Sequence, residues 1–367
     1  MTEAPRQIQR PERLNKVMNA AVTQRTVIPI LDFLKRHPGV LALIGFISGV
    51  ASFILVKRGN NLAVVLSLMM LLSWIWLTLE RHLRKGALQY FGVKVPRAAL
   101  RYLNQVVHQE SLFFVLPFFF ITTTWNSGQV VFLVLVGTAA LISVIDPWYY
   151  GWLASKRWLY FLFHGFTLFA LSLVALPIIV HLPTSQSYQW SLLIATLVSI
   201  PGAAGNLPVV WKGRIVTAAL LTVAIGGVTW LARPWVPPAN LWLVRVAIVE
   251  HLDSRTTAPV NSIRALDAAS LDEGLYAYTA IRAPRGLNER IYHVWYRDGQ
   301  EVDRIPLEIE GGRAEGYRAW THKVNFPPDA TGKWKIQVQT EIGQIVGVLR
   351  FKVTQAGQKE TRENNER

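Results

Sequence analysis

The chain has 367 residues, of which 51% are hydrophobic and 17% charged, and its formal net charge is +15. This charged fraction is below the ~25% of average soluble domains, which indicates a membrane part joined to a soluble part. The chain has no cysteine, so disulfides, thiolate metal sites and cysteine nucleophiles are excluded.

The positive charge is confined to the first two thirds of the chain. Residues 1–249 carry 21 Lys and Arg against 6 Asp and Glu, whereas residues 250–367 carry 17 of each sign. Basic residues between apolar runs are expected in membrane proteins. The charge therefore predicts a membrane protein and no nucleic-acid partner.

Residues 1–38 form a basic segment that either lies as a short helix on the cytoplasmic face or is solvated. Residues 39–232 predict an α-helical transmembrane bundle of about seven helices, since apolar runs near the ~20 residues needed to cross a bilayer follow one another. The predicted spans are 39–56, 62–79, 111–125, 130–145, 158–180, 190–204 and 215–232. Residues 96–110 predict an interfacial helix. The two runs within 111–145 are short, so they either span or form a re-entrant hairpin.

The distribution of Lys and Arg predicts the orientation of these spans. With the N-terminus in the cytoplasm, the cytoplasmic segments hold seven, six, two and two basic residues, a total of 17, whereas the short outer loops hold only Lys57 and Arg58. This bias predicts a multi-pass protein of the bacterial inner (plasma) membrane. The N-terminus is then cytoplasmic and everything from residue 233 onward is periplasmic.

The second part of the chain has the pattern of a β domain. Residues 233–273 predict a linker with a first strand near 241–249, and from residue 275 apolar side chains alternate with polar ones. Asp298-Gly299 is typical of a hairpin turn. Short strands at close spacing predict an antiparallel, immunoglobulin-like β-sandwich over 274–355, and a charged, disordered tail over 356–367.

Four short motifs resemble those of a known family. They are His293-x-Trp295, Arg318-x-Trp320-Thr321-x-Lys323, Gly332-x-Trp334, and Gly343 with Phe351. The chain resembles a bacterial family of unknown function, whose small C-terminal β domain follows a multi-span membrane domain. The resemblance implies this architecture and carries over no activity and no binding residues.

Two polar residues in the predicted bundle are candidates for function. His164 lies about six residues into an apolar span, and Asp146 ends the neighbouring antiparallel span. Intramembrane ionisable residues often serve function, so an Asp146–His164 pair that relays protons is one reading. The other reading is structural, with His164 hydrogen-bonded inside the bundle and Asp146 capping beside Pro147.

The β domain offers a candidate binding surface. Arg313, Tyr317, Arg318 and His293 are of types that stack on sugars or hold carboxylates and phosphates. A binding role and a structural role are both open for the three residues next to the Gly311-Gly312 turn.

No catalytic motif, cofactor fingerprint or metal-ligand cluster occurs in the sequence, so we expect no enzyme, no cofactor and no metal. The leading hypothesis is a β domain that binds a cell-envelope protein or glycan and is anchored in the lipid bilayer. The alternative is a small-solute transporter with an accessory periplasmic domain.

Overall fold

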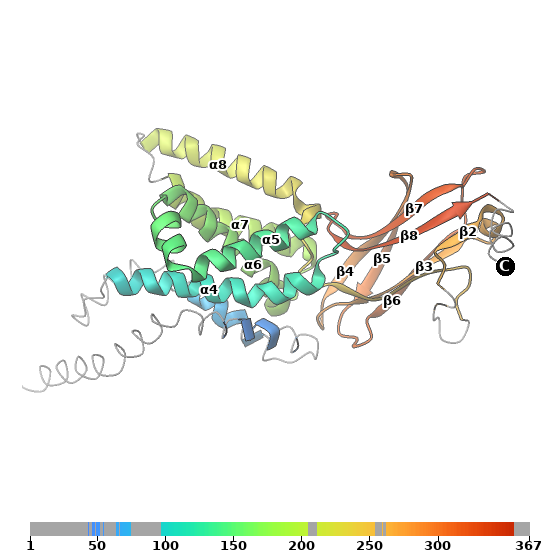
Figure 1. Cartoon of the computed structure of the whole chain (residues 1–367), viewed down its shortest axis with the longest axis horizontal. Helices are drawn as coiled ribbons and strands as arrows, with labels where there is room; N and C mark the ends of the chain where they lie inside the picture. The colour runs from blue at the N-terminus through green and yellow to red at the C-terminus, as the bar shows by residue number, and fades with distance from the viewer. Residues whose placement is uncertain are drawn as a thin grey trace, which may run out of the picture.

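The computed structural model describes residues 97–204, 211–253, 259 and 262–355, with scattered positions between 43 and 74. The predicted segments 1–38 and 356–367, and most of the first two predicted spans, lie outside the described residues. The described positions within 43–54 and 64–74 are helical. Figure 1 shows an elongated molecule, with the helices gathered at one end and the strands at the other.

The helical part contains five α-helices over residues 97–231 and a short π-helix. They are α4 (Arg97–Thr122), α5 (Gln129–Val144), the π-helix η1 (Pro147–Leu153), α6 (Arg157–Val180), α7 (Thr184–Ala204) and α8 (Trp211–Leu231). The loop from α6 to α7 has only three residues, which makes the two helices antiparallel neighbours. It turns at His181, whose φ of 55° is left-handed.

Among the described residues, two helices are long and apolar enough to cross a membrane, namely Arg101–Thr122 within α4 and α6. A third is counted if α5 and η1, which bend by 99°, form one span. The apolar stretch of α8, Ile215–Leu231, is shorter. The structure therefore supports a membrane protein with two or three candidate spans and does not support about seven.

The predicted division between residues 96–110 and 111–125 is wrong. Residues 97–110 and 111–122 belong to α4, a single helix of 26 residues. A single apolar face over residues 99–107 suggested an interfacial helix, yet Gln105, His108 and Gln109 of the same half are also buried inside the bundle. Polar partners on α6 and around η1 hold two of them there, a feature that periodicity does not reveal.

The C-terminal part contains eight strands in two sheets. They are β1 (Trp242–Val249), β2 (Ala265–Asp267), β3 (Leu275–Arg282), β4 (Asn288–Arg297), β5 (Gln300–Glu310), β6 (Tyr317–Lys323), β7 (Gly332–Thr340) and β8 (Ile345–Thr354). Short 3-10 turns precede β1, as η2 (Arg233–Trp235), and follow β2, as η3 (Ala268–Leu271).

One sheet has the order β1-β3-β6 and the other the order β2-β8-β7-β4-β5. A single apolar cluster takes side chains from both sheets, including Ile281 of β3 and the fully buried Trp295 and Trp334. The predicted hairpin turn is confirmed, because Asp298 and Gly299 have φ values of 46° and 91° between β4 and β5. The three-residue β2 was not predicted, since it is too short to show an alternating pattern.

Polar contacts join the helical part to the β part. Gln129 Nε2 at the start of α5 donates to the carbonyl of Ile345 at 2.6 Å. Arg233 Nε donates to the carbonyl of Ile342 at 2.7 Å, and Gln344 Nε2 to that of Val236 at 2.9 Å. The turn between β7 and β8 is thus bonded to the ends of the helices, which orients the β part relative to the bundle.

Candidate functional site

The predicted surface residues do not form one site. Arg313 lies over the ring of Tyr317, with its guanidinium 4.6 Å from the ring centre. Arg318 makes an ion pair of 3.4 Å with Glu315. His293 is fully buried, so it cannot share a surface with the other three. It bridges the two sheets, with Thr279 Oγ1 3.1 Å from Nε2 and Thr321 Oγ1 3.0 Å from Nδ1.

The two predicted intramembrane residues are not paired with each other. Asp146 Oδ1 accepts a hydrogen bond of 2.8 Å from Gln105 Nε2. His164 Nδ1 lies 3.0 Å from Nε2 of His108, a residue of α4 that the sequence did not single out. The other nitrogen of His108 lies 2.8 Å from the hydroxyl of Tyr149. A buried chain of Tyr149, His108 and His164 thus takes the place of the predicted relay.

A polar pocket adjoins this buried chain. The hydroxyl of Tyr150 donates to Gln105 at 2.6 Å, beside a pocket of about 400 Å³ that Arg101, Tyr149 and Tyr160 help to line. One end of the chain is therefore near solvent, and the other ends at His164, whose ring lies 4.6 Å from that of Trp74. The cluster can hold and exchange protons locally.

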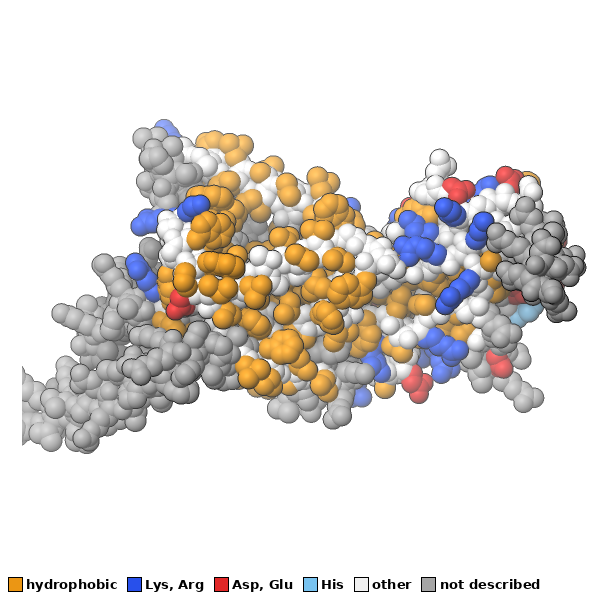
Figure 2. Space-filling model, in the orientation of Figure 1, with side chains coloured by type: hydrophobic (Ala, Val, Ile, Leu, Met, Phe, Trp, Pro, Cys, Tyr) orange, Lys and Arg blue, Asp and Glu red, His pale blue; other side chains and the backbone are white. Residues whose placement is uncertain are grey.

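The outer surface of β7 and β8 carries a group of cations that we call the cationic face. It surrounds a hollow of about 640 Å³ on the five-stranded sheet. Its members are Arg264, Lys333, Lys335, Arg350 and Lys352. Figure 2 shows Lys and Arg side chains gathered on the β part. Of the carboxylates that the structure describes, only Asp298 lines the hollow.

The register of the two strands places like charges directly opposite one another. Lys333 pairs with Lys352 and Lys335 with Arg350 across the β7–β8 ladder. Like charges in such cross-strand pairs are destabilising. Among the described residues, none of the five cations makes an ion pair with a carboxylate. The ammonium of Lys335 instead lies 4.3 Å from the ring centre of Tyr296.

Several other cations of the β part are paired with close carboxylates. Arg290 pairs with Glu308 at 3.0 Å, Arg304 with Glu301 at 3.0 Å, and Lys323 with Asp303 at 2.8 Å. The cationic face differs from these pairs because none of its five cations forms an ion pair with a carboxylate of the described residues. That difference is what a site for an external anion requires.

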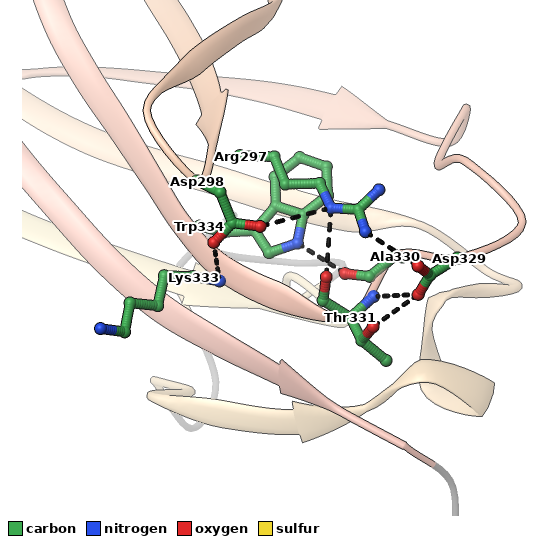
Figure 3. A network of polar contacts seen from close by, with 7 residues as sticks. All are labelled: Arg297, Asp298, Asp329, Ala330, Thr331, Lys333 and Trp334. Carbon is green, nitrogen blue, oxygen red and sulfur yellow. Dashed lines mark hydrogen bonds and ion pairs between the residues drawn. The ribbon is translucent and has the colours of Figure 1, made fainter.

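The carboxylates nearest the cationic face are occupied by other partners, as Figure 3 shows. Arg297 pairs with Asp329 at 3.2 Å and lies 3.8 Å from Asp298. Asp298 Oδ1 accepts from the backbone N–H of Lys333 at 3.0 Å, while the side chain of Lys333 points away from the network. The indole of Trp334 donates to the carbonyl of Ala330 at 2.8 Å, which fixes the start of β7.

The sequence held a signal for this surface. Lys333 and Lys335 alternate with buried residues on one strand, and Arg350 and Lys352 do the same on the next. Each pair separately is typical of a solvated strand face. Only the register across the turn brings the two pairs together, and spacing along the chain does not give that register.

No group of three or more His, Asp or Glu side chains that could hold a metal ion occurs in the described part of the chain. The two candidate sites among the described residues are the cationic face and the buried cluster of Tyr149, His108 and His164.

Two known protein families match the sequence of the chain. The family described as "Family of unknown function (DUF5924)" matches residues 20–277, more than half of the chain, and the protein belongs to it. Residues 288–353 match "Protein of unknown function (DUF2914)", which covers β4 to β8. The predicted relationship to an uncharacterised family with a C-terminal β domain is thereby confirmed. No curated protein matches the chain.

Proposed function

We propose that the protein is a non-enzymatic binding protein of the bacterial inner membrane whose β part recognises an acidic glycan of the cell envelope. The helical part anchors the β part, which folds as an immunoglobulin-like sandwich. The observation that carries the proposal is the cationic face, where Lys333, Lys335, Arg350 and Lys352 stand in register without carboxylate partners from the described chain.

The charge asymmetry of the chain supports a periplasmic position for the β part. Basic residues crowd the cytoplasmic connections of the predicted multi-span topology, with the N-terminus in the cytoplasm. The β part then emerges opposite these connections, in the compartment that contains envelope polymers.

The position of the cationic face argues against the anchoring membrane as its partner. β7 runs from Gly332 to Thr340, and the turn after it contacts the helices. At ~3.3 Å per residue, Lys333 lies roughly 20 Å along the strand from that contact. The cations therefore belong to the half of the β part that is remote from the bundle, as the position of β7 in Figure 1 illustrates.

The chemistry of the face favours a glycan over a protein. Protein interfaces have an apolar centre in which lysine is depleted. Here the exposed groups are cations, while the neighbouring Trp334 and Phe351 are buried. An extended polymer with repeated carboxylates or phosphates fits two rows of cations on adjacent strands.

A pair of charge reversals tests the proposal. The full-length protein in detergent is sedimented with purified peptidoglycan sacculi and, separately, incubated with immobilised lipopolysaccharide. We expect Lys333→Glu with Lys335→Glu to weaken binding to at least one of these acidic polymers tenfold or more. Raising the salt from 0.05 to 0.5 M should weaken the wild type, because exposed charges are screened.

The matched control is Arg313→Glu with Arg318→Glu, which changes the charge equally at the other candidate surface. We expect binding within twofold of the wild type. Loss of binding in this control alone would move the site to the Gly311-Gly312 turn. The proposal would be contradicted if the wild-type protein bound neither polymer. It would also be contradicted if crosslinking in intact envelopes captured only an acidic protein, because the ligand would then be a protein and not a glycan.

A second function, transport of a small solute, is favoured by one observation, the buried chain of Tyr149, His108 and His164. Histidine chains in membrane bundles often carry protons. Uptake into vesicles should then fall with His108→Gln or His164→Gln, whereas binding of acidic polymers should not change. The transport hypothesis would be wrong if vesicles with the wild-type protein and vesicles with these variants took up the same amount of solute.

A further inference from the structure

A second hollow lies in the helical part, between α8 and the helices α5, α6 and α7. Its volume is about 420 Å³, within the roughly 300–1,000 Å³ of small-molecule sites. Each helix contributes apolar walls, such as Phe132 of α5, Phe166 of α6, Leu192 of α7 and Ile225 of α8. Figure 1 shows α8 standing apart from α5 and α6 along this side.

The side chains around this groove indicate which part of the bilayer it faces. Side chains on the same helices that lie outside the groove are apolar and exposed, including Val134, Leu197 and Val223. α6 has the length and hydropathy of a membrane span. A groove in such an apolar surface faces the hydrocarbon region of the bilayer. The groups that can enter it from there are the acyl chains of lipids.

The two ends of the groove differ in polarity. Val236 lies at the end near the β part, and Trp158 at the other end, where α6 and α8 begin. Lys156 and Lys212 stand at these two helix starts, and both are exposed. A phosphate of a lipid headgroup would meet two exposed lysines at this end, whereas the cation at the other end, Arg233, is half-buried and already donates to the carbonyls of Trp230 and Ile342.

A buried hydroxyl supports the same orientation. Ser199 lines the groove, is 7% exposed, and its Oγ has no hydrogen-bond partner among the described residues. It lies five residues before the end of α7, on the lysine side of the groove. A hydroxyl there can donate to an ester carbonyl, which in a phospholipid lies between the acyl chain and the phosphate.

We propose that this groove is a binding site for one anionic phospholipid, with an acyl chain between α8 and α5–α7 and its phosphate near Lys156 and Lys212. The site is independent of the cationic face on the β part. It also gives α8, whose apolar stretch is short, a hydrocarbon partner on the side that faces α5, α6 and α7.

The test uses full-length protein purified in detergent, incubated with phosphatidylglycerol or phosphatidylcholine and examined by native mass spectrometry. We expect the wild type to retain one phosphatidylglycerol, at least fivefold more often than phosphatidylcholine. Thr196→Trp, which fills the groove from α7, should reduce retention tenfold. The control Leu197→Trp adds the same side chain to the exposed side of α7 and should bind like the wild type.

Two further variants complete the test. Ile225→Trp fills the groove from α8 and replaces Thr196→Trp if that variant does not fold. Lys156→Ala with Lys212→Ala should abolish the preference for phosphatidylglycerol while some lipid is still retained. Equal retention by the wild type and a folded groove-filling variant, or no retained lipid in the wild type, would overturn the proposal.

Discussion

His293 shows how a single titratable side chain can join the two sheets of the β part. Its imidazole contacts Thr279 on one side and Thr321 on the other, and it is fully buried. Burial lowers the pKa of His293 to about 3, because the charged form would lose its hydration. The residue is therefore neutral at physiological pH and serves as a hydrogen-bonding link.

This depressed pKa predicts acid sensitivity. The neutral imidazole stabilises the fold fully above the unfolded pKa of about 6.5, and that stability is lost as the pH falls toward 3. Between pH 7 and 4.5 the loss from this residue should be about 2 kcal/mol. Tryptophan fluorescence during denaturation should show it, and His293→Gln should flatten this part of the pH dependence. The same slope in both proteins would refute the assignment.

At the scale of elements, the helical and β parts meet where β4 reaches the start of α7. Glu289 of β4 accepts hydrogen bonds from Thr184, at 2.7 Å from the backbone N–H and 2.8 Å from the hydroxyl. Burial raises the pKa of Glu289 to about 7, against the opposing effect of these two hydrogen bonds. A carboxyl group that titrates near neutrality thus joins the two parts.

The raised pKa predicts a junction that weakens as the pH rises from 4.5 to about 7. The contribution of Glu289 is present in full below pH 4.5 and is lost by about pH 7, because in this window the open junction can ionise the carboxyl group whereas the closed junction keeps it protonated. Hydrogen–deuterium exchange of the amides at the start of α7, corrected for intrinsic rates, should increase between pH 4.5 and 7 and stay constant above pH 7. In Glu289→Gln this increase should be absent. Protection that does not change with pH in the wild type would exclude the mechanism.

The elements also show which features the sequence could predict. Alternation identified the strands around Trp295, Trp334 and Phe351, because each has one face in the core. It missed β2, whose three residues pair in parallel with β8. Apolar runs located α6 well. They placed the start of the span in α4 too late in the sequence, at residue 111. The polar residues of the first half of α4 are buried among partners that lie far away in the chain.

At the scale of the whole molecule, segregation of charge is the feature that defines the candidate site. Residues 250–367 are neutral in sum, so composition gave no reason to expect a cationic surface there. The site depends on pairing between strands, as Lys333 faces Lys352. The choice of Arg313, Tyr317 and Arg318 rested on residue type, and residue type does not show which cations the strand pairing brings together.

The central claim is that the cationic face looks into the envelope while the opposite end of the molecule faces the cytoplasm. The chain has no cysteine, so single cysteines can be labelled without background. Lys335→Cys should react with a membrane-impermeant maleimide in spheroplasts. Ser155→Cys, exposed at the other end of the molecule, should react only in inverted vesicles. Labelling of Lys335→Cys only in inverted vesicles would contradict the account.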